Sequence, residues 1–180
     1  MNKKKILIID DEIDIANNIK AILSDESYNS SVAHNSRDAM QLLSDNNYNL
    51  IILDVWLNNS DLDGIGILKK LRETNLTPVI IISGHGNIEM AVKAIKEGAN
   101  EFIEKPFTTE RLLLSVSRSI ELYEIRSENE RLKQENIYDY KFIGESIAIN
   151  KVKNLIKKVA PTTSRIMIYG DSGTGKDIVA

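Results

Sequence analysis

The apolar run Leu50–Leu53, which ends directly on Asp54, constrains the fold more than any other part of this sequence. Consecutive large apolar side chains bounded by turn residues are typical of a strand that is buried on both faces of a parallel sheet. A carboxylate is not tolerated in the middle of such a strand, so we expect Asp54 at its carboxyl end. Open α/β sheets bind their ligands at that edge.

Four further stretches read as strands, and three of them also end on polar residues. Lys5–Ile9 leads into Asp10, Asp11 and Glu12, Val79–Ile82 leads into Ser83, and Glu101–Glu104 leads into Lys105. A weaker run covers residues 30–33. Apolar residues recur at helical spacing between the strands as far as residue 120. This alternation favours right-handed βαβ units and predicts a doubly wound, five-stranded parallel sheet. Ser36 and Asn87 are the expected caps of two helices, and Gly98 is an expected helix terminator.

The chain is predicted to have three parts. An α/β domain covers residues 1–120, a helical linker covers 121–139, and an incomplete P-loop α/β segment covers 140–180. The linker helix contains a run with coiled-coil spacing, in which steps of three and four alternate: Leu122, Ile125, Asn129, Leu132 and Asn136. This run is short, so two interpretations stay open: a dimer seam, or a solvated linker helix with chance spacing.

Composition excludes several classes of protein. The 180 residues carry a net charge of -3, which does not favour nucleic acid or an anionic membrane as the main partner. The absence of cysteine excludes a disulfide scaffold. No apolar run approaches the roughly 20 residues of a membrane span. We therefore expect a cytoplasmic protein with no membrane partner.

The polar residues at the strand ends predict a phosphoryl-transfer site. Parallel strands would gather their carboxyl-end residues at one edge of the sheet: Asp10, Asp11, Asp54, Ser83 and Lys105. Clustered carboxylates need a cation, and oxygen ligands suit Mg²⁺. An aspartate can also attack phosphorus as a nucleophile, while a lysine and a hydroxyl neutralise charge on the phosphoryl oxygens. The alternative is that each acid is merely a solvated residue at a strand end.

Residues 1–120 resemble the receiver domain of two-component response regulators, which has a flavodoxin-like fold. The resemblance rests on Ile8–Glu12, Leu53–Asp54, Ile82–Gly86 and Phe102–Phe107. It implies that Asp54 accepts a phosphoryl group from the phosphohistidine of a sensor histidine kinase.

The same resemblance implies roles for the remaining site residues. The Mg²⁺ ligands would be Asp11, Asp54, Asp10 through a water molecule, and the backbone carbonyl of Trp56. Lys105 would pair with the phosphoryl group, and its bond to Pro106 is expected to be cis. Ser83 and Phe102 would be the switch pair. The loop between Asp54 and Gly64 departs from the family pattern because it is longer and lacks a proline; Asp61 and Asp63 in it are either solvated acids or extra ligands.

The last part of the chain contains a phosphate-loop pattern. A helix with Val152 and Leu155 on its apolar face and a strand at Arg165–Tyr169 are expected to precede it. The pattern itself consists of Gly170, Gly173, Thr174, Gly175, Lys176 and Asp177. It resembles the Walker A segment of sigma-54-dependent AAA+ regulators of the NtrC/NtrX type. The resemblance implies ATP binding in a full-length parent, and contact with sigma-54 RNA polymerase and DNA through regions absent from this sequence.

The leading hypothesis is therefore a phosphoacceptor signalling protein that controls transcription, forms a homodimer and is not itself an enzyme. A phospho-independent receiver-like interaction module is one alternative. A phosphatase with an Asp nucleophile is another, but such enzymes place a second Asp two positions later, where this chain has Trp56. A dinucleotide-binding enzyme is weakly supported, because neither Gly64-x-Gly66 nor Gly84-x-Gly86 is followed by the third glycine.

Overall fold

The computed structural model describes residues 3–58, 60–84, 88–139, 144–163 and 165–179. It divides the chain into two compact units, Met1–Arg126 and Ser127–Ala180, which are treated separately below. None of the helices in the described part of the chain is both long and apolar enough to cross a membrane.

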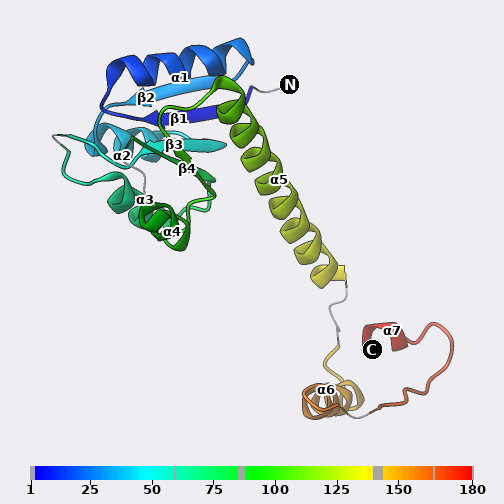
Figure 1. The fold of residues 1–180 in the computed structure, drawn as a ribbon. Coiled ribbons are helices and arrows are strands. Elements are labelled where there is room, and N and C mark those ends of the chain that lie inside the picture. The colour runs from blue at the N-terminus through cyan, green and yellow to red at the C-terminus, as the bar shows by residue number, and fades with distance from the viewer. Residues whose placement is uncertain (1–2, 59, 85–87, 140–143, 164, 180) are drawn as a thin grey trace. The chain divides into compact units, whose positions relative to one another are not determined.

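The first unit is built on one parallel sheet of five strands (Figure 1). The strands are β1 (Lys5–Ile9), β2 (Asn29–Ala33), β3 (Leu50–Asp54), β4 (Val79–Ser83) and β5 (Glu101–Glu104). Their order in the sheet is β2-β1-β3-β4-β5, so β3 lies at the centre. The pairing of Ile9 with Leu53, and of Asp54 with Ile82, aligns the carboxyl ends of the three middle strands. The predicted five-stranded, doubly wound parallel sheet is confirmed.

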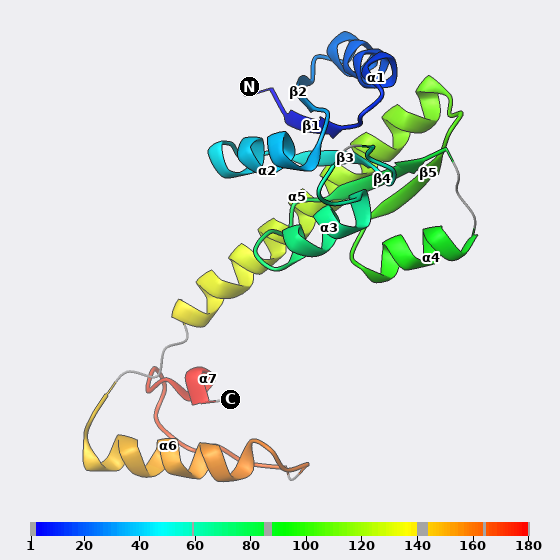
Figure 2. The same ribbon diagram turned by 90° about the vertical axis from the view of Figure 1, so that its left-hand side faces the viewer.

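Helices cover both faces of this sheet (Figure 2). They are α1 (Ile13–Asp25), α2 (Ser36–Asp45), α3 (Gly64–Arg72), α4 (Ile88–Lys96) and α5 (Thr109–Asp139). Alternate residues of each strand point to opposite faces, so the sheet separates two apolar cores. Leu7 and Ile51 pack with α2, α3 and α4, whereas Ile8 and Ile52 pack with α1 and α5. Nearly all of these strand side chains are fully buried, which makes the strand ends a rigid frame for polar groups.

The helix ends agree with the sequence expectations in part. The cap of α2 is Asn35 rather than Ser36: the Asn35 side chain accepts a hydrogen bond from the backbone N–H of Asp38 at 2.9 Å. Ser36 instead donates its own N–H to the Ser60 hydroxyl. Gly98 follows α4 with a φ of +100°, as expected of a helix terminator. Asn87, the other expected cap, lies outside the described residues.

Helix α5 runs without a break over 31 residues, as the absence of glycine and proline predicts. Its first turns pack on the sheet through Leu112, Val116 and Ile120. Beyond them, the apolar residues of the predicted seam are exposed, including Leu122 at 45% and Ile125 at 57%. The side chain of Asn136 lies outside the described set. An ion pair between Lys4 and Glu124 joins the start of β1 to this helix.

The second unit contains α6 (Ile147–Val159) and the short α7 (Lys176–Val179). None of its described residues is buried. The strand expected at Arg165–Tyr169 is not formed, and that prediction is wrong. A strand requires a neighbour for its backbone hydrogen bonds, and the described part of this unit offers none.

Candidate functional site

The strand ends of the sheet bring three of the predicted site residues together. Asp10 follows β1 and donates its backbone N–H to the carbonyl of Ala33, while Asp54 ends the neighbouring β3. Lys105 follows β5 and reaches back across the sheet. Its Nζ lies 2.6 Å from Oδ2 of Asp54 and 2.9 Å from Oδ2 of Asp10. All three side chains are largely or fully buried, so this ion-pair cluster belongs to the folded core.

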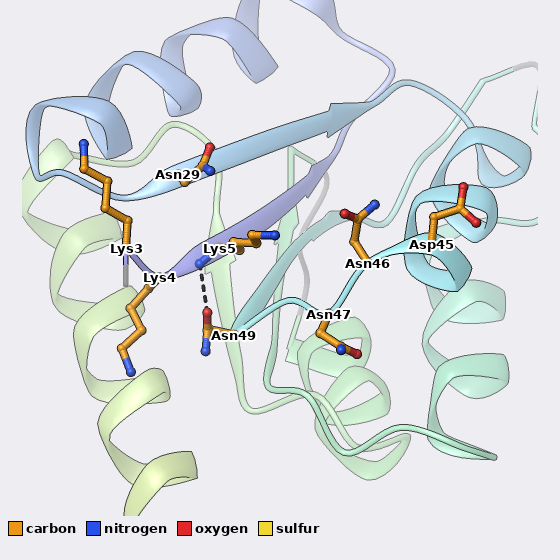
Figure 3. Close-up of a pocket in the computed structure, with 8 residues that line it drawn as sticks. All are labelled: Lys3, Lys4, Lys5, Asn29, Asp45, Asn46, Asn47 and Asn49. Atoms are coloured by element: carbon orange, nitrogen blue, oxygen red, sulfur yellow. Dashed lines mark hydrogen bonds between the residues drawn. The ribbon is translucent and has the colours of Figure 1, made fainter. Parts of the chain in front are cut away.

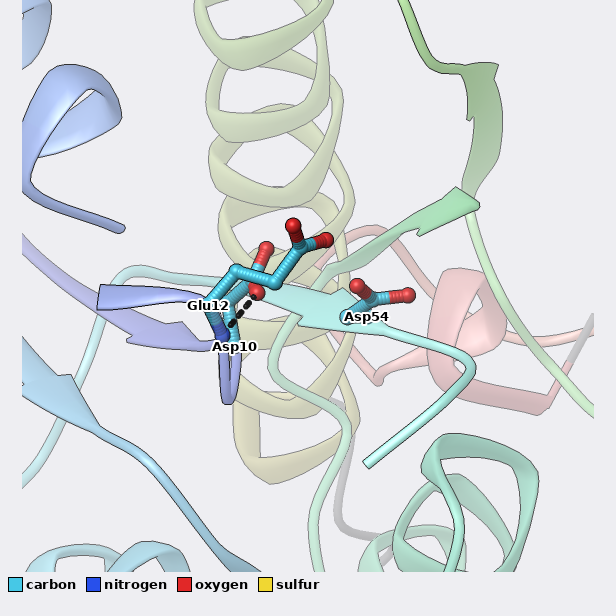
Figure 4. A group of neighbouring side chains, drawn as sticks. All are labelled: Asp10, Glu12 and Asp54. Atoms are coloured by element: carbon cyan, nitrogen blue, oxygen red, sulfur yellow. Dashed lines mark hydrogen bonds between the residues drawn. The ribbon is translucent and has the colours of Figure 1, made fainter. Parts of the chain in front are cut away.

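Glu12 completes a group of three carboxylates. One carboxylate oxygen from each of Asp10, Glu12 and Asp54 lies within 4.8 Å of the others. Figure 4 shows these carboxyl groups gathered beyond the ends of β1 and β3. The Glu12 side chain is exposed, and its Oε1 lies 3.4 Å from Nζ of Lys105. The sequence alone predicts no role for Glu12, although its place directly after two aspartates is a usable signal.

Burial and charge shift two pKa values within this cluster. Burial raises the pKa of Asp10, and the nearby charge of Asp54 acts in the same direction; hydrogen bonds from Lys105 and the Glu12 backbone oppose this rise only in part. Burial alone would lower the pKa of Lys105, but hydrogen bonds to Asp54 and Asp10 outweigh it and raise that pKa. Lys105 is therefore positively charged. Burial makes the ionised form of Asp10 unfavourable unless a further cation binds beside it.

The donor set suits a hard divalent cation. Three carboxylates share a single ammonium group, so negative charge is in excess at the strand ends. All the groups that could act as ligands are oxygens, which fits Mg²⁺ and does not fit a soft metal. The pKa of Asp10 is raised mainly by burial and further by the nearby charge of Asp54, and a cation would relieve this repulsion.

Asp11 does not join this group among the described residues. Its Oδ2 instead accepts two hydrogen bonds from Asn58, one from the side-chain amide at 2.8 Å and one from the backbone N–H at 3.2 Å. Among the described residues, the carboxylates that lie together are therefore Asp10, Glu12 and Asp54, and the predicted role of Asp11 as a ligand stays a prediction. Which of three consecutive acids faces the site depends on the turn after β1, and periodicity does not specify that turn.

The expected switch and backbone positions lie at the end of β4, in β5 and in the loop after β3. The Ser83 side chain is fully buried at the end of β4, and Phe102 in β5 is half-buried against the core shared with α3 and α4. Trp56 is 49% exposed, and its backbone N–H donates to Oδ1 of Asp54 at 3.1 Å. The bond between Lys105 and Pro106 is cis, as expected.

The long loop after Asp54 is anchored at several points. The Ser60 hydroxyl accepts the backbone N–H of Ser36 at 2.8 Å. Asp63 caps α3 by accepting the backbone N–H of Gly66 at 2.6 Å. Asp61 is exposed and lies 3.9 Å from Arg37. Asp63 thus has a structural partner, and neither acid belongs to the carboxylate group around Asp54.

In the second unit, the phosphate-loop residues form a turn before α7. Gly173 and Gly175 adopt φ values of +80° and +79°, which side chains rarely tolerate. The Thr174 hydroxyl donates to the carbonyl of Asp171 at 2.7 Å. Nζ of Lys176 donates to the carbonyls of Gly170 and Asp171 at 2.8 and 2.5 Å, within the loop itself. The side chain of Asp177 lies outside the described set.

An open polar pocket of about 740 Å³ lies at the opposite edge of the sheet, before β1 and β3 (Figure 3). It is lined by lysine and asparagine side chains together with one acid: Lys3, Lys4, Lys5, Asn29, Asp45, Asn46, Asn47 and Asn49. It shares no residue with the carboxylate group, so the chemistry of the strand ends does not involve it.

Comparison with known proteins agrees with this geometry. Residues 6–117 match the response regulator receiver domain, and residues 142–180 match the sigma-54 interaction domain. A response regulator of Rickettsia bellii described as NtrX-like is 46% identical over 97% of this chain and 37% of its own length. The chain thus spans less than two fifths of that relative.

Solved structures point the same way. The receiver domain of NtrX from Brucella abortus is 44% identical, with a TM-score of 0.62 over 64% of this chain and 98% of that one. A structure of Brucella abortus NtrX in complex with ATP is 41% identical, with a TM-score of 0.74 over 99% of this chain and 39% of that one. With its parallel sheet and the acids and lysine at the strand ends, the chain belongs to the response regulator receiver family and continues into the start of a sigma-54 interaction domain.

Proposed function

We propose that this chain is the phosphoacceptor part of a two-component transcription regulator and that Asp54 is the residue that becomes phosphorylated. The observation that carries the proposal is the contact of a buried carboxylate, at the end of the central strand, with both a lysine and a further carboxylate group. Asp54 Oδ2 lies 2.6 Å from Nζ of Lys105, within the group formed with Asp10 and Glu12. The donor of the phosphoryl group would be the phosphohistidine of a sensor histidine kinase.

In the proposed reaction, a carboxylate oxygen of Asp54 attacks phosphorus while the bond from phosphorus to the histidine nitrogen of the donor breaks. The imidazole leaves with the bonding electron pair and takes up a proton, and an acyl phosphate remains on Asp54. Oδ1 is already oriented by the backbone N–H of Trp56 at 3.1 Å. Lys105 would turn from the carboxylate to a phosphoryl oxygen, because its charge is then better matched there.

The cation assigned to the site is Mg²⁺, which when bound would offset negative charge on the phosphoryl oxygens. The proposed ligands are Asp10, Asp54, the carbonyl of Trp56 and, as the resemblance implies, Asp11. Glu12 lies near this group. Ser83 would donate its hydroxyl to the phosphoryl group, and Phe102 would pack behind it in the modified state. Their positions at the end of β4 and in β5 support these roles.

The output of the whole protein is also a proposal. The match of residues 142–180 to a sigma-54 interaction domain supports control of transcription through sigma-54 RNA polymerase and DNA. ATP binding by a longer parent is supported by the structure of the NtrX relative in complex with ATP. A homodimer through the α5 seam or the receiver, a cytoplasmic location and the absence of enzymatic activity from the 180 residues belong to the same proposal.

Intact mass spectrometry tests the proposal directly. The 180-residue chain is incubated with a small acyl phosphate and Mg²⁺, beside Asp54→Asn as the matched control. We expect one added phosphoryl group on the wild-type chain, labile in base, and none on the variant. A folded wild-type chain that stays unmodified, or a variant that is modified equally, would show that Asp54 is not the acceptor and would favour a phospho-independent interaction module.

A further inference from the structure

One carboxylate of the acidic run, Asp11, bonds to the loop between β3 and α3 and is not part of the carboxylate group around Asp54. Asn58 donates both its side-chain amide and its backbone N–H to Oδ2 of Asp11, at 2.8 and 3.2 Å. Hydrogen bonds to a charged acceptor are stronger than those between neutral groups. Asp11 is therefore satisfied by the loop, while its neighbours in the chain on both sides face Asp54.

Hydrogen bonds of the described loop residues on either side of Asn58 restrain the segment that carries it. Upstream, the backbone N–H of Trp56 is bonded to Asp54. Downstream, the hydroxyl of Ser60 is bonded to the start of α2, and Asp63 caps α3. Little freedom is then left for Asn58 to lose when it bonds to Asp11, and this favours the contact.

We propose that Asn58 is a positioning residue that acts as a latch on Asp11, so that Mg²⁺ must compete with the loop for this carboxylate. The inference rests on the proposed function, because the cation in question is the one assigned to the phosphoacceptor site. In the latched arrangement, Lys105 provides the positive charge beside Asp54 and Asp10. Asp11 is not in the group of carboxylates that could hold the cation together, so its side chain would have to turn to join them, and the hydrogen bonds from Asn58 oppose that turn.

This competition has a defined thermodynamic consequence. A ligand that binds one of two states must work against any contact that is present only in the other state. Removing the side-chain amide of Asn58 weakens the latched state and leaves the carboxylates unchanged. The affinity for Mg²⁺ should therefore rise, by about 3- to 10-fold for the loss of one partly solvated hydrogen bond to a charged group.

The first experiment is a Mg²⁺ titration of the 180-residue chain and of Asn58→Ala. Trp56 is the only tryptophan in the sequence and follows Asp54 closely, so its fluorescence reports on the site. Calorimetry provides a second measurement that does not depend on the indole. The matched control is Asn47→Ala, an exposed asparagine at the opposite edge of the sheet, which should leave the affinity unchanged.

A double-mutant cycle separates the latch from any general effect on the loop. Asp11→Ala should weaken Mg²⁺ binding, and adding Asn58→Ala to it should change nothing more. An Asn58→Ala variant that binds Mg²⁺ as the wild type does, or more weakly, would overturn the latch. An increase that persists without Asp11 would overturn it as well. A wild-type chain with no Mg²⁺ binding at all would refute the proposed function too, so the two failures are distinguishable.

Discussion

Gly64 begins α3 directly against the backbone of the residue that carries the central carboxylate. A Cβ atom at this position would lie 2.0 Å from the carbonyl oxygen of Asp54 and 2.9 Å from Cα of Val55, whereas real Cβ atoms essentially never approach within 3.0 Å. Both opposing atoms belong to the backbone, so no side-chain rotation relieves the contact. The Gly64 N–H also donates to the carbonyl of Val55 at 2.8 Å, which fixes the spacing. Gly64→Ala must therefore move the end of β3 or the start of α3 by about 1 Å.

The expected loss of stability follows from this displacement. Overpacking typically destabilises a protein by about 1–3 kcal/mol, and a clash between two backbone segments belongs at the upper end of that range. The better helix propensity of alanine offsets at most about 1 kcal/mol. We expect Gly64→Ala to unfold at a lower urea concentration, corresponding to a net loss of roughly 2 kcal/mol, with an unchanged slope of the transition. Displacement of Asp54 should also reduce phosphoryl incorporation measured by intact mass.

Gly84→Ala is the matched control, because it changes the same type of residue at the end of the neighbouring strand. The nearest atom that its Cβ would meet is Cδ of Lys105, at 4.0 Å, which is an ordinary contact. Its stability should stay within about 0.5 kcal/mol of the wild type. If Gly64→Ala proves as stable as Gly84→Ala, the close approach of α3 to Asp54 does not exist in solution and the reasoning is refuted.

Two further substitutions test the site and the core. Burial raises the pKa of Asp10 above its ordinary 3.8, so its ionised form opposes folding above that pH and has no effect below it. Asp10→Asn should therefore raise the urea midpoint of unfolding at pH 7, and this gain in stability should disappear as the pH falls through 3.8. An equal gain at pH 7 and below pH 3.8 would contradict the raised pKa of Asp10. Leu112→Ala removes a fully buried side chain of α5 and should lower the free energy of unfolding in urea by about 2–5 kcal/mol. The control Leu114→Ala changes a position that is 61% exposed on the same helix and should lower it by less than about 0.5 kcal/mol.

The first unit was predictable because β1, β3 and β4 are continuous apolar runs with buried side chains. The polar residues that follow these runs mark the sheet edge. The apolar run Arg165–Tyr169 looks the same in the sequence but forms no strand, since strand formation depends on a partner and not only on apolar residues. The cap of α2 lies one residue earlier than the sequence predicts, because Asn35 and Ser36 are both good capping residues and only the backbone geometry separates them.

The site was predictable to the extent that strand register determines it. Asp10 and Asp54 occupy the ends of adjacent parallel strands, and Lys105 is long enough to reach them from β5. The orientation of Asp11 was not predictable, because consecutive residues in a turn can point in any direction. The partner of Asp11 was equally hidden: an asparagine in a long polar loop looks like any other solvated residue, and only the three-dimensional path of the loop brings Asn58 to Asp11.

The hydrogen bonds of Asp54 explain why one carboxylate can be both buried and reactive. Its two oxygens have separate donors, the Trp56 N–H on Oδ1 and the Lys105 ammonium on Oδ2. Each carboxylate oxygen has two lone pairs, so one hydrogen bond on each leaves capacity for a bond to phosphorus. The Lys105 ammonium lies 2.6 Å from Oδ2 of Asp54 and draws electron density from the oxygen that it contacts. In the proposed reaction, Lys105 would move from the Asp54 carboxylate to an oxygen of the incoming phosphoryl group, and the carboxylate oxygen would then be a better nucleophile. The same ammonium would stabilise first the resting carboxylate and then the negative charge of the product.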